Sequence, residues 1–115
     1  MENKLKIQFN VVKRRKKEND FYQKEVTCNE KSISDMKNKI LSIEDNLEEH
    51  RYKIKKKEEI INESYAMLLL SDKSYNNDFN TLENLYNEII KNNFNIDNNL
   101  LKDVNNFIDD YYKFT

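Results

Sequence analysis

The chain has 115 residues, of which 36% are charged and 37% hydrophobic, and its formal net charge is −1. This length fits one domain, and the balanced charge excludes a protein that binds polyanions over its whole surface. The apolar fraction is too low for a thick core, but thin helical seams need only about two or three apolar residues per heptad, and their regular spacing argues against disorder. Glycine and proline are both absent, so we expect an all-α protein whose function comes from its surface.

A first heptad repeat predicts one long helix over about residues 3–45. Its a positions are Leu5, Val12, Asn19, Val26, Ile33, Ile40 and Leu47, and its d positions are Gln8, Arg15, Tyr22, Asn29, Met36 and Ile43. Asn19 is expected to be a buried polar group of the kind that fixes register at some cost in stability. Residues 44–46 are expected to form the turn that follows.

A second heptad repeat predicts another long helix over about residues 48–92. Its seam consists of Ile54, Ile61, Leu68, Tyr75, Leu82 and Ile89. Helix-poor Ser, Asp and Asn residues gather at 71–78. This stretch is the candidate position for a kink or a break.

A shorter amphipathic helix is predicted over about residues 97–113. Its apolar positions step by three or four and are Leu100, Val104, Phe107, Tyr111 and Phe114. The connection before it is rich in Asn, which tolerates the left-handed conformation that glycine usually supplies at a helix end. Either Asn95 or Asp97 is expected to cap the third helix.

The width of the apolar stripes predicts how the helices assemble. The stripe is broad at the start of the first helix and at the end of the second, and it narrows toward the turn between them. We therefore expect a single domain over residues 1–115, folded as an antiparallel three-helix bundle. The third helix covers the two broad halves, and a two-helix coiled coil forms near the first turn.

Nothing in the sequence predicts catalysis, a metal site or a cofactor. His50 lies beside a predicted turn without further ligands, and Cys28 is expected to be a small, partly buried residue next to the seam. The carboxylates form no distinct acid–base pair. The longest apolar run, residues 66–70, is too short to cross a bilayer, and the first residues lack a signal-peptide pattern. We expect a soluble intracellular protein that is not an enzyme.

Five consecutive cations occupy residues 13–17. Consecutive helical residues point in all directions, so they form a collar around the helix and not a stripe. A nuclear-import or nucleic-acid patch is one interpretation, and docking to an acidic protein surface is the other.

The most apolar patch is the run Met67, Leu68, Leu69 and Leu70. Leu68 falls on the seam, whereas Leu69 and Leu70 point away from it. Two interpretations stay open: the end of the third helix, with Tyr111 and Phe114, covers these side chains, or they are exposed anchors for a partner.

Two gapless stretches of the chain carry a resemblance to a known family. In the first helix the matching residues are Lys6, Ile7, Val11, Val12, Lys13, Arg14, Lys17, Glu18, Tyr22, Lys24 and Glu25. In the second they are Tyr52, Ile54, Lys55, Lys56, Glu59, Ile60, Glu63, Ser64, Met67, Phe79 and Leu82. In this order and spacing, the chain resembles tubulin-binding cofactor A, a family of small tubulin-folding chaperones.

The chain also departs from that pattern. Arg15 stands where the family usually has Leu, so its charge is expected to snorkel outward or to loosen that layer. Asp20 replaces an apolar residue. Leu69 replaces a proline, so any kink there is expected to be weaker. The third helix matches only in length and pattern.

The resemblance implies a monomeric three-helix bundle that binds quasi-native β-tubulin and holds it for assembly with α-tubulin, without nucleotide or metal. It also implies a cytoplasmic, cytoskeleton-associated protein with no nucleic-acid, membrane or small-molecule partner. The candidate partner-binding residues are exposed positions in or beside the matching stretches: Lys13, Arg14, Lys17, Lys55, Lys56, Glu59, Glu63, Met67, Leu69 and Leu70. The rival hypotheses are a structural coiled coil that dimerises through the heptad seam and a nucleic-acid or nuclear-import module that uses the basic collar.

Overall fold

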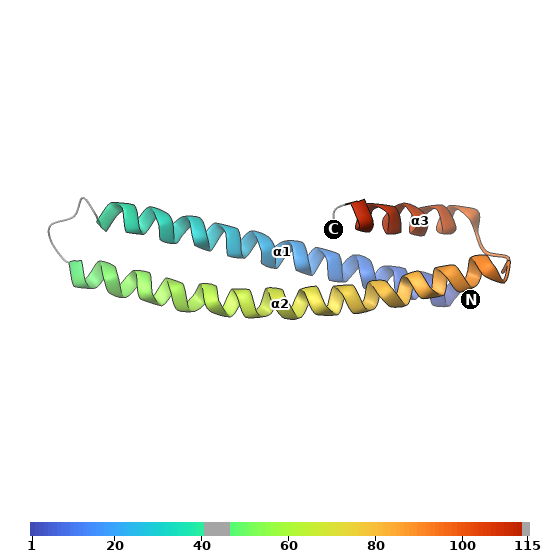
Figure 1. The fold of residues 1–115 in the computed structure, drawn as a ribbon, viewed down its shortest axis with the longest axis horizontal. Helices are drawn as coiled ribbons and strands as arrows, with labels where there is room; N and C mark the ends of the chain where they lie inside the picture. The colour runs from blue at the N-terminus through green and yellow to red at the C-terminus, as the bar shows by residue number, and fades with distance from the viewer. Residues whose placement is uncertain (41–46, 114–115) are drawn as a thin grey trace. The chain divides into compact units, whose positions relative to one another are not determined.

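The structure is a computed structural model that describes residues 1–40 and 47–113. Within these ranges it contains three helices and no strands: α1 (Glu2–Ile40), α2 (Leu47–Lys91) and α3 (Asn98–Lys113) (Figure 1). The predicted all-α class is confirmed, and each described helix end lies close to the predicted one. The predicted end of the first helix at residue 45 and the turn at 44–46 lie outside the described residues.

The chain packs as two compact units. The terminal unit comprises Met1–Lys16 and Lys73–Thr115, and the middle unit comprises Lys17–Asp72. Both α1 and α2 contribute to each unit. The assignment of the whole chain to a single domain stays a prediction.

Residues from all three helices share one apolar core in the terminal unit. This core consists of Leu5, Phe9 and Val12 from α1, Phe79, Leu82, Leu85 and Ile89 from α2, Val104 and Ile108 from α3, and Ile96 just before α3. The Phe9 and Phe107 rings meet edge to face with centroids 5.6 Å apart, a favourable arrangement for aromatic pairs. The two broad apolar halves predicted from the sequence therefore lie in one core with α3.

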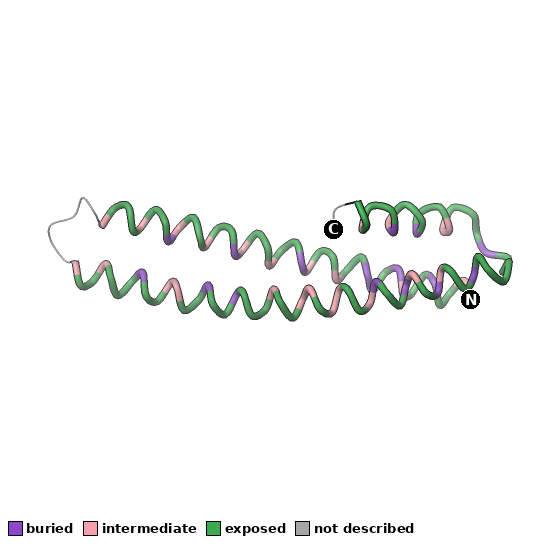
Figure 2. The backbone as a smooth tube through the Cα atoms, in the orientation of Figure 1, coloured by how far each residue is buried: buried purple, intermediate pink, exposed green. Residues whose placement is uncertain are grey.

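A thinner seam joins α1 and α2 in the middle unit. Its buried side chains are Asn19, Val26 and Ile33 from α1 and Ile54, Ile61 and Ser64 from α2. In Figure 2 the buried positions of this unit lie on the facing sides of the two helices. The predicted d residues Tyr22, Asn29 and Met36 are half-buried, so the heptad register of α1 is confirmed.

The order of the contacts between α1 and α2 is consistent with antiparallel helices. In the middle unit, Asn19 bonds to Ser71, whereas Ser32 accepts a hydrogen bond from Lys57. Partner numbers therefore fall along α2 as they rise along α1.

The helix-poor stretch at 71–78 does not interrupt α2, which is helical throughout. The polar side chains of this stretch bond to α1: Ser71 to Asn19 in the middle unit, and Asp78 to Arg15 in the terminal unit. These tertiary bonds offset a weak local helix propensity.

The connection between α2 and α3 uses Asn in place of glycine. Asn93 has a φ of 53°. The Phe94 N–H bonds to the Ile89 carbonyl, and the Asn93 N–H bonds to that of Ile90. This is the Schellman pattern that closes a helix. The Asp97 carboxylate then accepts the Asn99 N–H at 3.3 Å, so Asp97 is the cap of α3, one of the two predicted candidates.

Candidate partner-binding surface

Two features of the described residues bear on metal binding and on membrane insertion. Residues 1–40 and 47–113 contain no cluster of three or more His, Cys, Asp or Glu side chains placed to hold a metal ion. None of the described helices is both long enough and apolar enough to span a bilayer.

The cations of the basic collar, residues 13–17, make different contacts, as expected for side chains that point in different directions around a helix. The Lys13 ammonium lies 4.4 Å from the centroid of the Phe9 ring, and that of Lys16 lies 5.7 Å from Phe107. Both are distances at which a cation is attracted to an aromatic face. Arg14 and Lys17 are exposed and have no charged partner among the described residues. These two cations are the ones left available to a partner.

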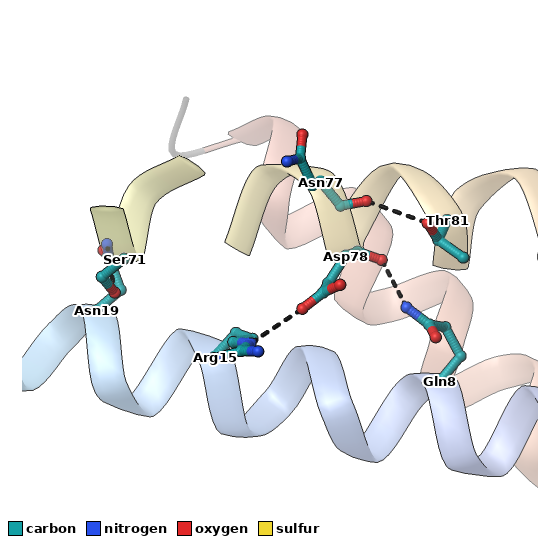
Figure 3. Close-up of polar contacts among 7 residues, drawn as sticks. All are labelled: Gln8, Arg15, Asn19, Ser71, Asn77, Asp78 and Thr81. Carbon is teal, nitrogen blue, oxygen red and sulfur yellow. Dashed lines mark hydrogen bonds and ion pairs between the residues drawn. The ribbon is translucent and has the colours of Figure 1, made fainter. Parts of the chain in front are cut away.

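Arg15 pairs with a carboxylate of α2, and 37% of its side chain remains exposed. Its Nε donates to Oδ2 of Asp78 at 3.0 Å (Figure 3). Gln8 donates from the same face of α1 to the Asp78 backbone carbonyl at 2.9 Å. α2 thus supplies a carboxylate opposite this position that the sequence did not predict. The choice between an outward charge and a loosened layer stays a prediction.

Asn19 is buried, as predicted, and its side-chain amide is satisfied. Its Nδ2 donates to the Ser71 hydroxyl at 3.4 Å and to the Asp72 carboxylate. Only 8% of the residue is exposed. A buried amide that needs these two partners fixes the register of the seam around it.

All ten candidate partner-binding residues are exposed. Lys13 and Arg14 belong to the terminal unit, and the other candidates belong to the middle unit. Two of the ten, Glu63 and Met67, line one groove. Which of the candidates bind a partner stays a prediction.

This groove, which we name the Tyr22–Met67 groove, lies between α1 and α2 in the middle unit. It has a volume of about 200 Å³ and is lined by Tyr22, Glu25, Ile60, Glu63, Ser64 and Met67. Both of its charged lining residues are carboxylates, and neither Glu25 nor Glu63 is in an ion pair among the described residues. The groove thus combines apolar side chains with two carboxylates.

An exposed apolar stripe on α2 runs past the groove. Its members lie three or four residues apart, the spacing that places residues on one face of a helix. They are Tyr52, Lys56, Ile60, Glu63, Met67 and Leu70. The apolar members of this stripe are 44% to 61% exposed. Sequence reasoning missed Tyr52 and Ile60 as surface anchors, although their spacing off the seam was a usable signal.

Leu69 is 72% exposed and Leu70 is 61% exposed. This exposure favours the interpretation of the two side chains as uncovered surface residues. Phe114 lies outside the described residues. Because adjacent helical residues point about 100° apart, Leu69 does not share the stripe of Leu70.

A second, larger groove of about 680 Å³ also lies in the middle unit. It is lined by Asp20, Gln23, Lys24, Val26, Thr27, Cys28 and Leu68. Its charged lining residues have both signs, so it favours no partner charge. Cys28 is exposed, which corrects the expectation of partial burial, because a position two residues beyond the buried Val26 points away from α2.

The comparison with protein families decides the assignment. Residues 1–108 match the family described as Tubulin binding cofactor A. The chain belongs to this family. The match continues beyond α1 and α2 into α3 (Asn98–Lys113), further than the stretches that carried the resemblance. No curated protein and no solved structure matched the chain.

Membership of the tubulin binding cofactor A family implies a chaperone-type role in tubulin folding. An assembly of helices with exposed side chains on both α1 and α2 is suited to a role in which one surface binds another protein. That the candidate residues form this surface stays a prediction.

Proposed function

We propose that this protein is a tubulin-folding cofactor that binds β-tubulin folding intermediates and holds them for assembly with α-tubulin. It acts as a monomer, folded as an antiparallel three-helix bundle, and without catalysis. The family match over residues 1–108 carries this proposal. A cytoplasmic, cytoskeleton-associated location follows from the same role.

The charged and apolar candidates have different tasks in this proposal. Arg14 and Lys17 are exposed cations without a charged partner among the described residues, so they attract and orient an acidic client surface. Met67, Leu69 and Leu70 are exposed apolar side chains that supply contact area once the client is in place. The proposed contact residues also include Lys13, Lys55, Lys56, Glu59 and Glu63.

Two observations weigh against the rival functions. The α1 seam is buried against α2 of the same chain, so an intramolecular partner already occupies the surface that a coiled-coil dimer would use. The basic collar is divided among Phe9, Phe107 and Asp78, so its cations do not form one continuous phosphate-binding face.

A pull-down from cell extract tests the proposal directly. Immobilised protein is expected to retain β-tubulin without a stoichiometric amount of α-tubulin, and blotting for each tubulin measures the ratio. Equal retention of both tubulins, or of neither, would remove the proposed role. Sedimentation at micromolar protein checks the monomer separately, since a coiled-coil dimer would sediment at twice the mass.

A further inference from the structure

We infer that the Tyr22–Met67 groove receives a basic amphipathic helix of the client protein. This inference rests on the proposed function, because it states what the client presents to one face of the cofactor. It concerns the middle unit alone.

The charge of the groove defines the chemistry of its occupant. Glu25 and Glu63 come from different helices and line the same hollow, and no lysine or arginine lines it. Lys56, the cation in the neighbouring stripe, lies 5.6 Å from the centroid of the Tyr52 ring. A lysine or arginine of the client fits this setting, since its methylene stem covers apolar surface while its charge meets the carboxylates.

The apolar surface around the carboxylates defines the shape of the occupant. Ile60 is 50% exposed and Met67 is 44% exposed, and both line the groove. The stripe continues along α2 to Tyr52 in one direction and to Leu70 in the other, a length of about 27 Å at about 1.5 Å per residue. A straight apolar stripe of this length matches the contact face of a docked helix.

The terminal unit shows how this chain covers a pair of helices. There, α3 adds a third helix to the core that α1 and α2 form. In the middle unit, Ile60 and Met67 are exposed beside the seam of α1 and α2. A client helix would complete the middle unit in the same manner.

The test uses two double variants with the same change in charge. The groove variant, Glu25→Lys with Glu63→Lys, reverses the charge of the two carboxylates that line the groove. The control variant, Glu30→Lys with Asp35→Lys, reverses the charge of two exposed carboxylates of the middle unit that do not line it. Circular dichroism and urea unfolding first establish that both proteins fold. The probes are purified β-tubulin and two synthetic helical peptides with the same leucine face, one flanked by lysine and the other by glutamate.

We expect the lysine-flanked peptide to bind the unmodified protein, and the groove variant to bind it about tenfold more weakly. The matched control variant and the unmodified protein should bind it equally. The glutamate-flanked peptide should show no binding. The affinities of β-tubulin for the three proteins should fall in the same order as those of the lysine-flanked peptide. Equal peptide affinity for both double variants would overturn the inference.

The outcomes for the groove and for the proposed function can be separated. If β-tubulin binds the unmodified protein and both variants equally, the groove inference fails and the proposed function stands. If β-tubulin binds none of them but the lysine-flanked peptide binds in a Glu25- and Glu63-dependent manner, the proposed function fails and the groove chemistry stands. A conservative Glu25→Gln with Glu63→Gln variant should lose less affinity than the reversal, because it removes attraction without adding repulsion.

Discussion

Arg15 and Asp78 are joined across α1 and α2 of the terminal unit by a contact of 3.0 Å between Nε and Oδ2. Arg15 occupies a d position of the heptad repeat, where an apolar side chain is usual. The two side chains remain 37% and 30% exposed, so neither charge is fully removed from water. An ion pair therefore replaces an apolar layer without a large desolvation cost.

This pair should contribute little to stability. A double-mutant cycle with Arg15→Ala and Asp78→Ala is expected to give a coupling free energy of about 0.5 kcal/mol, because half-exposed ion pairs are screened by solvent. Urea unfolding of the four proteins measures it, and added salt should reduce it further. A coupling well above 1 kcal/mol would show that the pair behaves as a buried one.

Replacement of Asn19 should separate stability from register. Asn19→Ala is expected to lower the free energy of unfolding by about 1 to 2 kcal/mol, because the Ser71 and Asp72 side chains lose their partner. Asn19→Leu should restore the free energy of unfolding and increase self-association. An apolar side chain at this a position no longer disfavours other helix registers or pairing with a second copy of the chain. Urea unfolding and sedimentation equilibrium follow the two effects, and a strictly monomeric Asn19→Leu protein would contradict the register role.

Docking of α3 should depend strongly on Tyr111. Its ring stacks on Phe79 with centroids 3.6 Å apart, and its hydroxyl bonds to Asn76 at 2.6 Å. Tyr111→Ala is expected to cost about 2 kcal/mol and to speed amide exchange in α3. Asn105→Ala is the control, since Asn105 is an exposed position on the same helix. Equal effects of the two substitutions would show that the stacking is unimportant.

The terminal unit should lose stability in alkali. The Tyr112 hydroxyl donates to Glu83 at 2.5 Å, and this hydrogen bond raises the pKa of Tyr112 from its ordinary value of 10.0. The folded state holds the proton more tightly than the unfolded chain. The contribution is therefore present below pH 10 and is lost as the pH rises above it.

Burial also raises the pKa of Tyr111, so ultraviolet titration of tyrosinate should show late-ionising groups, and Tyr112→Phe should remove one of them. Urea midpoints measured between about pH 9 and pH 11 should fall more steeply for the unmodified protein than for this variant. Identical slopes would indicate that the Glu83 bond does not persist in solution.

A comparison of Leu70 with Leu69 can identify the face that meets the client. Both side chains are well exposed, so substitution by serine should change stability by less than about 0.5 kcal/mol in each case. If the client lies over the Tyr22–Met67 groove, Leu70→Ser should weaken β-tubulin binding several-fold more than Leu69→Ser. Surface-immobilised protein and soluble β-tubulin give the two affinities, and the reverse order would place the client on the other flank of α2.

Periodicity alone was enough to predict the helices and their buried faces. The a positions Leu5, Val12, Asn19, Val26 and Ile33 are all buried, because a seven-residue repeat keeps one side of a helix against its neighbour. The chemistry of Asn predicted the left-handed residue after α2, which the structure places at Asn93.

Features that depend on two distant segments could not be predicted in this way. The sequence showed a charge at Arg15 but not Asp78 opposite it, since their pairing depends on the alignment of α1 with α2. The Tyr22–Met67 groove could not be predicted either, because Glu25 and Glu63 lie far apart in the chain.

Cys28 is the chain's single cysteine, and its side chain is exposed on α1 in the middle unit. A thiol of this kind reacts readily with maleimide reagents, which gives a homogeneous product without any engineered residue. A fluorophore or a nitroxide attached there would report on whatever approaches that flank of the native molecule, in real time and in crude mixtures.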